Sequence, residues 1–277
     1  MGFFDWLFGN KNKEIKFNEI PKDWKTVLQN EVPFYVSLSS DEQMEFERRM
    51  LRFLNTTKIT GIKTSVEDQD RVLIAASAII PIFAFENWEY HNLQEVLLYP
   101  AHFDENFLIG SKSKAILGMV GYGYMEGKMI LSKKSLHHGF SNSTDKQNTA
   151  IHEFIHLIDK SDGNIDGVLS CFKDKQHILP WVEMMNQKII EIQQEESDIR
   201  TYGATNQAEF LAVAGEYFFE RPALLKKKHP MLYKYLEMMF RQPLANRKLK
   251  KKARATRHFD PCPCKSGKKF RACCSLD

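Results

Sequence analysis

Residues 151–157 of this chain read Ile151-His152-Glu153-Phe154-Ile155-His156-Leu157. On an α-helix, residues i and i+4 lie on the same face, so the imidazoles of His152 and His156 can bind one metal ion. The carboxylate of Glu153 then lies beside the open coordination position, where it can take a proton from a zinc-bound water molecule. The stretch therefore predicts a helix that carries a hydrolytic zinc site.

The sequence around this stretch favours a helix. An apolar stripe that includes Phe154 and Ile158 runs along it, and Ser161-Asp162-Gly163 is expected to end it. In an alternative interpretation, the two His pack half-buried on an amphipathic helix and Glu153 is solvated. A third metal ligand would decide between the two. The candidate N-caps are Ser141, Ser143, Thr144 and Asp145.

The third ligand has one candidate close in sequence. Zinc sites that hydrolyse amides commonly use three protein ligands and a water molecule, and His-His-Glu is one known set. Asp162 follows His156 by six residues, but this spacing needs a sharp turn at a glycine, and Asp159 stands at that position. We interpret Asp159 instead as an acceptor for a ligand N–H, or as a helix-end acid without a role.

Two further candidates lie on a second predicted helix, residues 205–220. Glu209 and Glu216 are seven residues apart, so they share one face of this mostly apolar helix. An inward carboxylate on a buried helix is costly unless it binds a metal ion or a partner, which makes both residues functional candidates. As alternatives, Glu209 closes a capping box with the N-cap Asn206, and Glu216 is a surface charge at the margin of the apolar stripe.

These segments resemble known metallopeptidases. Residues 202–210 resemble the part of anthrax lethal factor that supplies its zinc-binding Glu and, seven residues earlier, its catalytic Tyr. From about residue 35 to 240, the chain resembles the Mlc titration factor A family of zinc metallopeptidases. Ile155 replaces the small residue that this family usually has within its His motif. The second resemblance rests on Ile74-Ala75-Ala76, Leu98-Tyr99-Pro100, Ile130-Leu131-Ser132, residues 152–159 with Asp162-Gly163, and residues 208–213.

The resemblance implies an enzyme with a defined set of site residues. By resemblance, His152, His156 and Glu209 bind a catalytic Zn²⁺, Glu153 is the general base, and Tyr202 stabilises the oxyanion. Zinc lowers the pKa of bound water to about 7, and one oxyanion donor typically contributes ~3 kcal/mol. Without the resemblance, Tyr202 would be interpreted as an ordinary, partly buried turn residue.

The expected activity is that of an aminopeptidase on small peptide substrates, by resemblance. The alternative is a non-catalytic or weakly catalytic binding protein, because the family name records binding to a transcriptional repressor. A transcriptional regulator is therefore a possible partner by resemblance.

Composition and pattern predict an α+β fold, with a helix-rich, zincin-like metallopeptidase domain, a small sheet and a C-terminal zinc knuckle. The chain is 43% hydrophobic, which suffices for a sizeable core. The resemblance assigns residues 128–132 to the sheet edge beside the metal helix, where an edge strand pairs with substrate backbone. We predict helices at 39–55, 68–85, 181–194 and 231–240, and strands at 96–99, 116–122 and 128–132.

We expect a cytoplasmic protein without a transmembrane segment. The longest apolar stretch, residues 72–85, contains Pro81 and is too short to cross a bilayer. Residues 1–8 are too short for a signal peptide, and we expect this apolar octamer to dock on the protein body. Five other histidines are interpreted as unassigned surface residues: His137, His138, His177, His229 and His258.

The C-terminal part of the chain differs in charge. Residues 226–277 contain sixteen Lys or Arg and three Asp or Glu. We predict a metallopeptidase domain at 1–244, a basic linker at 245–257 and a zinc knuckle at 258–277. The linker can bind phosphate backbones nonspecifically, or can simply be a soluble tether.

Four of the five Cys fall within thirteen positions of the predicted knuckle. This density indicates a tetrahedral zinc site, and disulfides are the weaker interpretation because adjacent Cys rarely bridge each other. Residues 260–274 resemble the SEC-C motif. A knuckle this small needs metal to fold, so this second Zn²⁺ is structural. The resemblance implies docking to an acidic protein, a ribosome or nucleic acid. The four ligands are Cys262, Cys264, Cys273 and Cys274.

Overall fold

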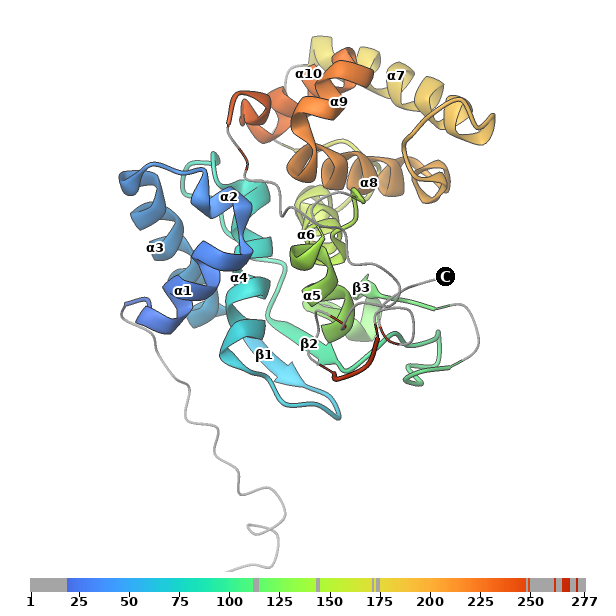
Figure 1. Cartoon of the computed structure of the whole chain (residues 1–277). Helices are drawn as coiled ribbons and strands as arrows, with labels where there is room; N and C mark the ends of the chain where they lie inside the picture. The colour runs from blue at the N-terminus through green and yellow to red at the C-terminus, as the bar shows by residue number, and fades with distance from the viewer. Residues whose placement is uncertain are drawn as a thin grey trace, which may run out of the picture.

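The computed structural model describes residues 19–111, 115–142, 145–170, 172, 175–247, 249, 262, 266–269 and 273. Most of the described chain is helical, with one small sheet (Figure 1), which confirms the predicted α+β class. The expected docking of residues 1–8 lies outside the described residues. No helix in the described ranges is long and apolar enough to cross a membrane.

The predicted helices are present and differ from the prediction at their ends, but the helices at 22–31, 33–36, 133–141 and 222–228 and the strand at 58–61 were not predicted. α7 begins six residues earlier than predicted, and α4 ends three residues earlier. The helices are α1 (Lys22–Glu31), α2 (Pro33–Val36), α3 (Ser40–Thr56), α4 (Asp68–Ile82), α5 (Lys133–Ser141), α6 (Thr149–Asp159), α7 (Lys175–Gln193), α8 (Gln207–Glu220), α9 (Pro222–Lys228) and α10 (Pro230–Phe240). The strands are β1 (Lys58–Gly61), β2 (Glu95–Tyr99), β3 (Gly118–Val120) and β4 (Lys128–Ser132).

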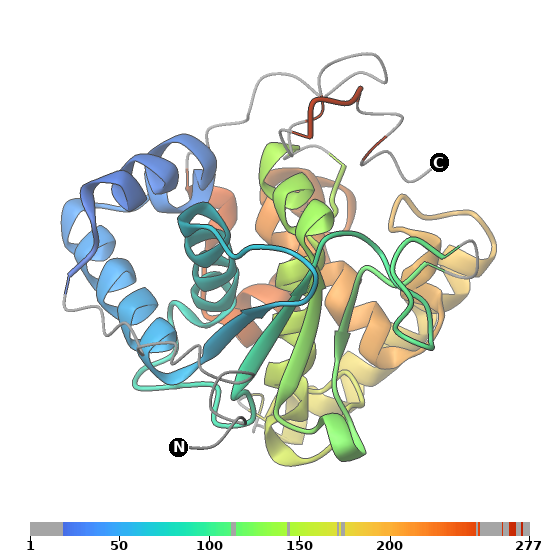
Figure 2. The same ribbon diagram turned by 90° about the horizontal axis from the view of Figure 1, so that it is seen from below.

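The sheet has the strand order β1-β2-β4-β3, in which only β3 is antiparallel to its neighbour. The prediction that residues 128–132 form the sheet edge is therefore wrong. A short turn joins β3 to β4, so the two strands pair as a hairpin and β3 covers the edge of β4. β3 is thus the outer strand (Figure 2), and its regular part is shorter than the predicted strand 116–122.

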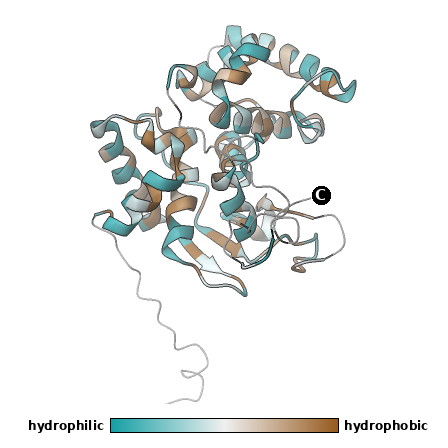
Figure 3. Cartoon of the chain, viewed as in Figure 1, coloured by the Kyte–Doolittle hydropathy of each residue, from teal (hydrophilic) through white to brown (hydrophobic). Residues whose placement is uncertain are grey.

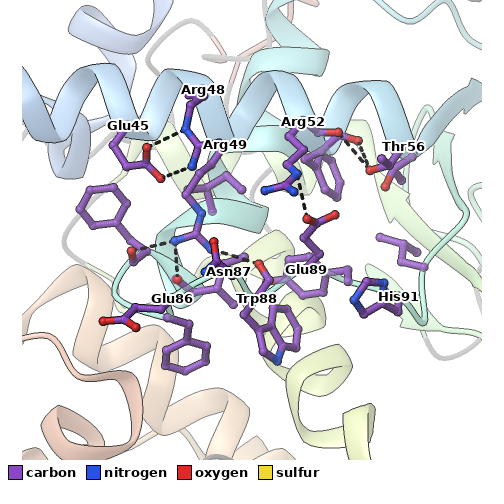
Figure 4. A pocket seen from close by; sticks show the side chains of 18 of the residues that line it. Glu45, Arg48, Arg49, Arg52, Thr56, Glu86, Asn87, Trp88, Glu89 and His91 are labelled. Atoms are coloured by element: carbon purple, nitrogen blue, oxygen red, sulfur yellow. Dashed lines mark hydrogen bonds and ion pairs between the residues drawn. The ribbon is translucent and has the colours of Figure 1, made fainter.

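The predicted buried helix, α4, lies between α3 and α6 and is fully buried from Val72 onward. Figure 3 shows its concentration of hydrophobic residues. Where α4 ends, the buried Arg49 of α3 donates hydrogen bonds to the carbonyls of Ile82 (2.9 Å), Phe83 (2.8 Å) and Trp88 (3.2 Å) (Figure 4). These bonds tie α3 to the end of α4 and hold the loop that leads to β2.

The metal-motif helix, α6, begins at a different cap from those predicted. Its N-cap is Asn148, whose Oδ1 accepts a hydrogen bond from the Ile151 N–H (3.2 Å). Of the predicted caps, Ser141 belongs to α5 and Asp145 binds the Gln147 N–H, while Ser143 and Thr144 lie outside the described residues. The predicted stop holds, because one 3₁₀ turn follows α6 and ends at Gly163 with φ 97°.

Helix α8 packs directly on α6, and the contact depends on a glycine. A Cβ atom built on Gly215 would overlap Cδ1 of Ile155. The absence of a side chain at Gly215 therefore makes room for Ile155, which stands where the resembling family has a small residue. The two helices approach closely enough for carboxylates of α8 to reach the histidines of α6.

Substitution of Gly215 by Ala is expected to destabilise the protein by about 1–3 kcal/mol, because the added methyl group overpacks the contact with Ile155. Ile155→Ala alone leaves a cavity and is expected to cost about 2–5 kcal/mol. In the double variant the new methyl group fills part of that cavity, so the free energies of unfolding should not add. Denaturant unfolding of the four proteins measures this coupling, and strict additivity would contradict the contact.

Candidate metal centre

The structure brings His152, His156 and Glu209 together at the contact between α6 and α8. The two Nε2 atoms are 3.1 Å apart, and Oε2 of Glu209 lies 2.9 Å from Nε2 of His152 and 3.4 Å from Nε2 of His156. Tetrahedral zinc with bonds of 2.0–2.1 Å places its ligand atoms about 3.3 Å apart. The three side chains therefore fit one zinc ion without rearrangement of the helices.

Glu216 lies two turns further along the same face of α8 and is buried, with 1% of its surface exposed. Its Oε1 accepts a hydrogen bond from Nδ1 of His152 (2.8 Å) and pairs with Arg200, while Oε2 accepts from the Asn148 N–H (2.6 Å). The interpretation of Glu216 as a surface charge is therefore wrong. Its bond to Nδ1 leaves Nε2 of His152 directed toward Glu209 and His156.

The carboxylates control the charge of the His cluster. Burial opposes a charge on the His152 ring, but its hydrogen bonds to Glu209 and Glu216 raise its pKa to about 10. Burial alone would raise the pKa of Glu209, yet the adjacent His152 and His156 hold it well below its ordinary value. Glu209 is thus an ionised carboxylate, as a zinc ligand must be.

Glu153 faces the same cavity, and only 5% of its surface is exposed. Burial raises its pKa above the ordinary value for a glutamate, although the nearby His152 and His156 oppose the shift. A Cβ atom on Gly118 of β3 would lie 2.6 Å from Oε1 of Glu153. The edge strand can therefore pass beside this carboxylate only because residue 118 is glycine.

Tyr202 lies on a 3₁₀ turn (Thr201–Ala204) just before α8. Its ring is 46% exposed, and the ring centroid is 5.9 Å from that of His152. Partial burial and the negative charge of Glu209 raise its pKa to about 12, so the phenol stays protonated and can donate a hydrogen bond. The phenol lines the same cavity as the His pair.

The other candidates take different places. Asp162 is exposed and accepts a hydrogen bond from the Asn164 N–H (3.0 Å). Asp159 is buried and accepts from the Gly167 N–H (2.9 Å), so it anchors the loop after α6. Asn206 is the N-cap of α8, as predicted, but the side chain of Glu209 faces the histidines and does not close a capping box.

Two histidines that were interpreted as surface residues are buried. Nε2 of His137 lies 2.7 Å from Asp70, and Nε2 of His229 lies 2.7 Å from Asp198. Both therefore belong to internal polar contacts between elements. Sequence patterns do not reveal such pairs, because their partners are 67 and 31 residues away.

The metal-motif residues open into a cavity of about 760 Å³ between β3, α6 and the start of α8. A second cavity, of about 540 Å³, lies beside α3 and contains none of the predicted site residues (Figure 4). Among the residues that line the larger cavity, the carboxylates are Glu105, Glu153, Glu209 and Glu216, and the only Lys or Arg is Arg200. The sequence analysis missed Arg200 and Glu105, because neither belongs to a motif.

Part of the predicted zinc knuckle is described. Cys262 is buried, and its N–H donates a hydrogen bond to the Lys268 carbonyl (2.8 Å). Sγ of Cys273 lies 2.9 Å from Oγ of Ser266. Cys264 and Cys274 lie outside the described residues, so the four-Cys site stays a prediction, as does the boundary of the linker.

A mixed sheet whose edge strand flanks a His-Glu-x-x-His helix, with an acidic residue supplied by a facing helix, defines the scaffold of a metallopeptidase. The chain belongs to the glucose-regulated metallo-peptidase M90 family, whose model matches residues 7–241. Residues 260–276 match the SEC-C motif. The two matches confirm the resemblances to a metallopeptidase family and to the SEC-C motif.

Relatives of this chain include proteins named Mlc titration factor A. The one from Pectobacterium atrosepticum is 25% identical over 88% of this chain and 94% of its own length. The one from Salmonella gallinarum is 26% identical over 86% of this chain and 92% of its own length. A protein of Synechocystis sp. described as uncharacterized is 28% identical over 88% of this chain and 93% of its own length.

Zinc content tests the ligand assignments. We expect two zinc ions per chain in the metal-saturated protein, and one in the Glu209→Ala variant, because that site keeps only two of its three protein ligands. Asp162→Ala is the matched control and should keep two. Metal analysis of the dialysed proteins measures this, and two zinc ions in Glu209→Ala would contradict the assignment.

Proposed function

We propose that this chain is a zinc-dependent peptidase that hydrolyses peptide bonds at the cavity between β3, α6 and α8. The observation that carries the proposal is the convergence of three ligand atoms within 4.8 Å of one another beside a buried glutamate. Charge supports it as well. Glu153, Glu209 and Glu216 face Arg200, the only Lys or Arg in the cavity lining, and all three favour a proton on His152. A divalent cation would take the place of that proton.

In this proposal, His152, His156 and Glu209 hold the zinc ion. When bound, zinc supplies Lewis acidity, which polarises a carbonyl group and acidifies water. Glu153 takes the proton from the attacking water and returns it to the leaving amine. Its raised pKa suits this role, because a more basic carboxylate accepts the proton more readily.

Tyr202 would donate a hydrogen bond to the substrate oxygen as that oxygen becomes negative. Removal of one such donor typically costs about 3 kcal/mol of transition-state stabilisation. Its place on the cavity wall, near His152, supports this role. Its raised pKa supports it too, since the group must carry its proton to donate.

The edge strand β3 would bind the substrate backbone. It pairs with β4 on one side, and Gly118, Met119 and Val120 line the cavity. A peptide can add to such an edge through main-chain hydrogen bonds. The prediction gave this role to residues 128–132, but they lie inside the sheet, so we propose β3 instead.

We further propose that the enzyme removes residues from the free N-terminus of small peptides. The cavity wall is rich in carboxylates, and Arg200 is already paired with Glu216. Such a wall favours an ammonium group over a C-terminal carboxylate. Glu105 is exposed on this wall and therefore accessible to a substrate amine.

Replacement of Glu153 by Gln tests the enzyme assignment. We expect peptide cleavage to fall by at least about a thousandfold, because no group would accept the proton of the attacking water. Zinc content should be unchanged, since Glu153 is not a ligand in this proposal. Cleavage is measured on a peptide library with zinc-loaded protein. If wild-type protein cleaves no peptide, the result supports the alternative function. In that function the chain is a scaffold that captures a regulatory partner, as the name of the relatives suggests.

Peptides with a blocked N-terminus test the proposed exopeptidase action. Wild-type protein should cleave a free-amine peptide at least about tenfold faster, in kcat/KM, than its N-acetylated counterpart, since acetylation removes the positive charge. Glu105→Gln should reduce this preference, and Glu126→Gln, outside the cavity lining, is the matched control. Equal cleavage of both peptides would indicate an endopeptidase.

The SEC-C segment is proposed to be a recognition module that delivers this activity. Its match to the motif supports a structural zinc ion held by Cys262, Cys264, Cys273 and Cys274. The excess of Lys and Arg in residues 226–277 favours an acidic protein, a ribosome or nucleic acid as partner.

A further inference from the structure

One buried carboxylate connects three separate segments of the site. Glu216 of α8 accepts hydrogen bonds from the Asn148 N–H, where α6 begins, and from Nδ1 of His152, one turn later. It also pairs with Arg200, which immediately precedes the 3₁₀ turn of Tyr202. Both oxygens of this carboxylate therefore act as hydrogen-bond acceptors: Oε2 for the Asn148 N–H and Oε1 for Arg200.

The bond to His152 determines which ring nitrogen is available to a metal ion. Oε1 of Glu216 already accepts from the Arg200 guanidinium, which can only donate, so in the contact with the same oxygen Nδ1 of His152 is the donor and carries the proton. Nε2 is then free to act as a ligand, and the ring cannot rotate without losing the bond. Such acceptors typically raise metal affinity 10–100-fold.

The ion pair between Glu216 and Arg200 lies on the side of the site that carries Tyr202. Arg200 is two residues before Tyr202, and it lies on the cavity wall. The segment is also anchored at Asp198, which binds Nζ of Lys146 (2.8 Å) and Nε2 of His229 (2.7 Å). Of these two anchors, Arg200 is the nearer in sequence to Tyr202, and its guanidinium pairs with the same carboxylate that binds His152. The phenol itself is hydrogen-bonded to Glu209, so Arg200 acts on the backbone of the turn.

We propose that Glu216 and Arg200 are positioning residues: Glu216 fixes the ligand tautomer of His152, and through Arg200 it also fixes the turn that presents Tyr202. This inference rests on the proposed function and adds to it a shared anchor for the metal ligand and the oxyanion donor. His152 and Arg200 then keep a constant relation to each other, because both bind one oxygen atom, Oε1 of Glu216.

The first experiment measures zinc affinity by competition with a chromogenic chelator. We expect Glu216→Gln to bind the catalytic zinc 10–100-fold more weakly than wild type. Glu220→Gln, one turn further along the same face of α8, is the matched control and should bind zinc like wild type. The ¹⁵N resonances of His152 in the zinc-loaded proteins report the tautomer, and the Nδ1–H signal should change in Glu216→Gln only.

The second experiment separates positioning from stability. Arg200→Gln keeps the Glu216 to His152 bond, so zinc affinity should change little, while kcat falls at least about tenfold with KM nearly unchanged. In the double variant Glu216→Gln/Arg200→Gln, two amides replace the ion pair, and thermal stability should recover. Its zinc affinity should remain as low as that of Glu216→Gln. If Glu216→Gln does not fold, the double variant provides the affinity measurement.

The outcomes are distinct. Wild-type zinc affinity in Glu216→Gln, or in the double variant, would overturn the proposal. Recovery of zinc affinity together with stability in the double variant would also overturn it, since the role would then be structural only. If zinc-loaded wild type cleaves no peptide, the proposed function fails, but the affinity and tautomer results still decide the role of Glu216.

Discussion

The close packing of α8 on α6 is the constraint on which the site depends. Two of the proposed ligands come from α6 and the third from α8, so the spacing of the helices sets the spacing of their ligand atoms. Gly215 permits this spacing because it leaves room for Ile155. The same region of the contact also includes the ion pair between Glu216 and Arg200. Burial of Glu216 would be costly in isolation, and His152 and Arg200 offset this cost with charge-assisted bonds.

The sequence was sufficient for the parts that local periodicity determines. His152, Glu153 and His156 could be placed on one helix because a turn of α-helix has a fixed length, and the spacing of Glu209 and Glu216 placed both on one face. Both carboxylates contact His152, and which of them reaches the Nε2 atoms depends on the position of α8 along its axis relative to α6. That position follows from packing against α6, which no local pattern encodes, and only the resemblance favoured Glu209 at that stage.

The features that sequence analysis missed are long-range. The order of the strands depends on a hairpin and two crossovers, so the edge was assigned to β4 although β3 occupies it. Asn148 was overlooked because several residues upstream of α6 could also cap a helix. Arg200 belongs to no motif, and its role arises because a long side chain reaches across to α8. The sequence therefore indicated the candidate metal-binding and catalytic residues better than it indicated the residues that hold them in place.

The order of the site residues along the chain has a consequence for biosynthesis. His152 and Glu153 are made first, but Tyr202 and Glu209 follow only about fifty residues later. During translation, α6 therefore emerges with its histidines exposed and without the carboxylates that complete the cluster. No shortened chain that ends before α8 can assemble the set of three ligands. If the proposed function holds, hydrolytic capacity would thus appear only when the fold is nearly complete.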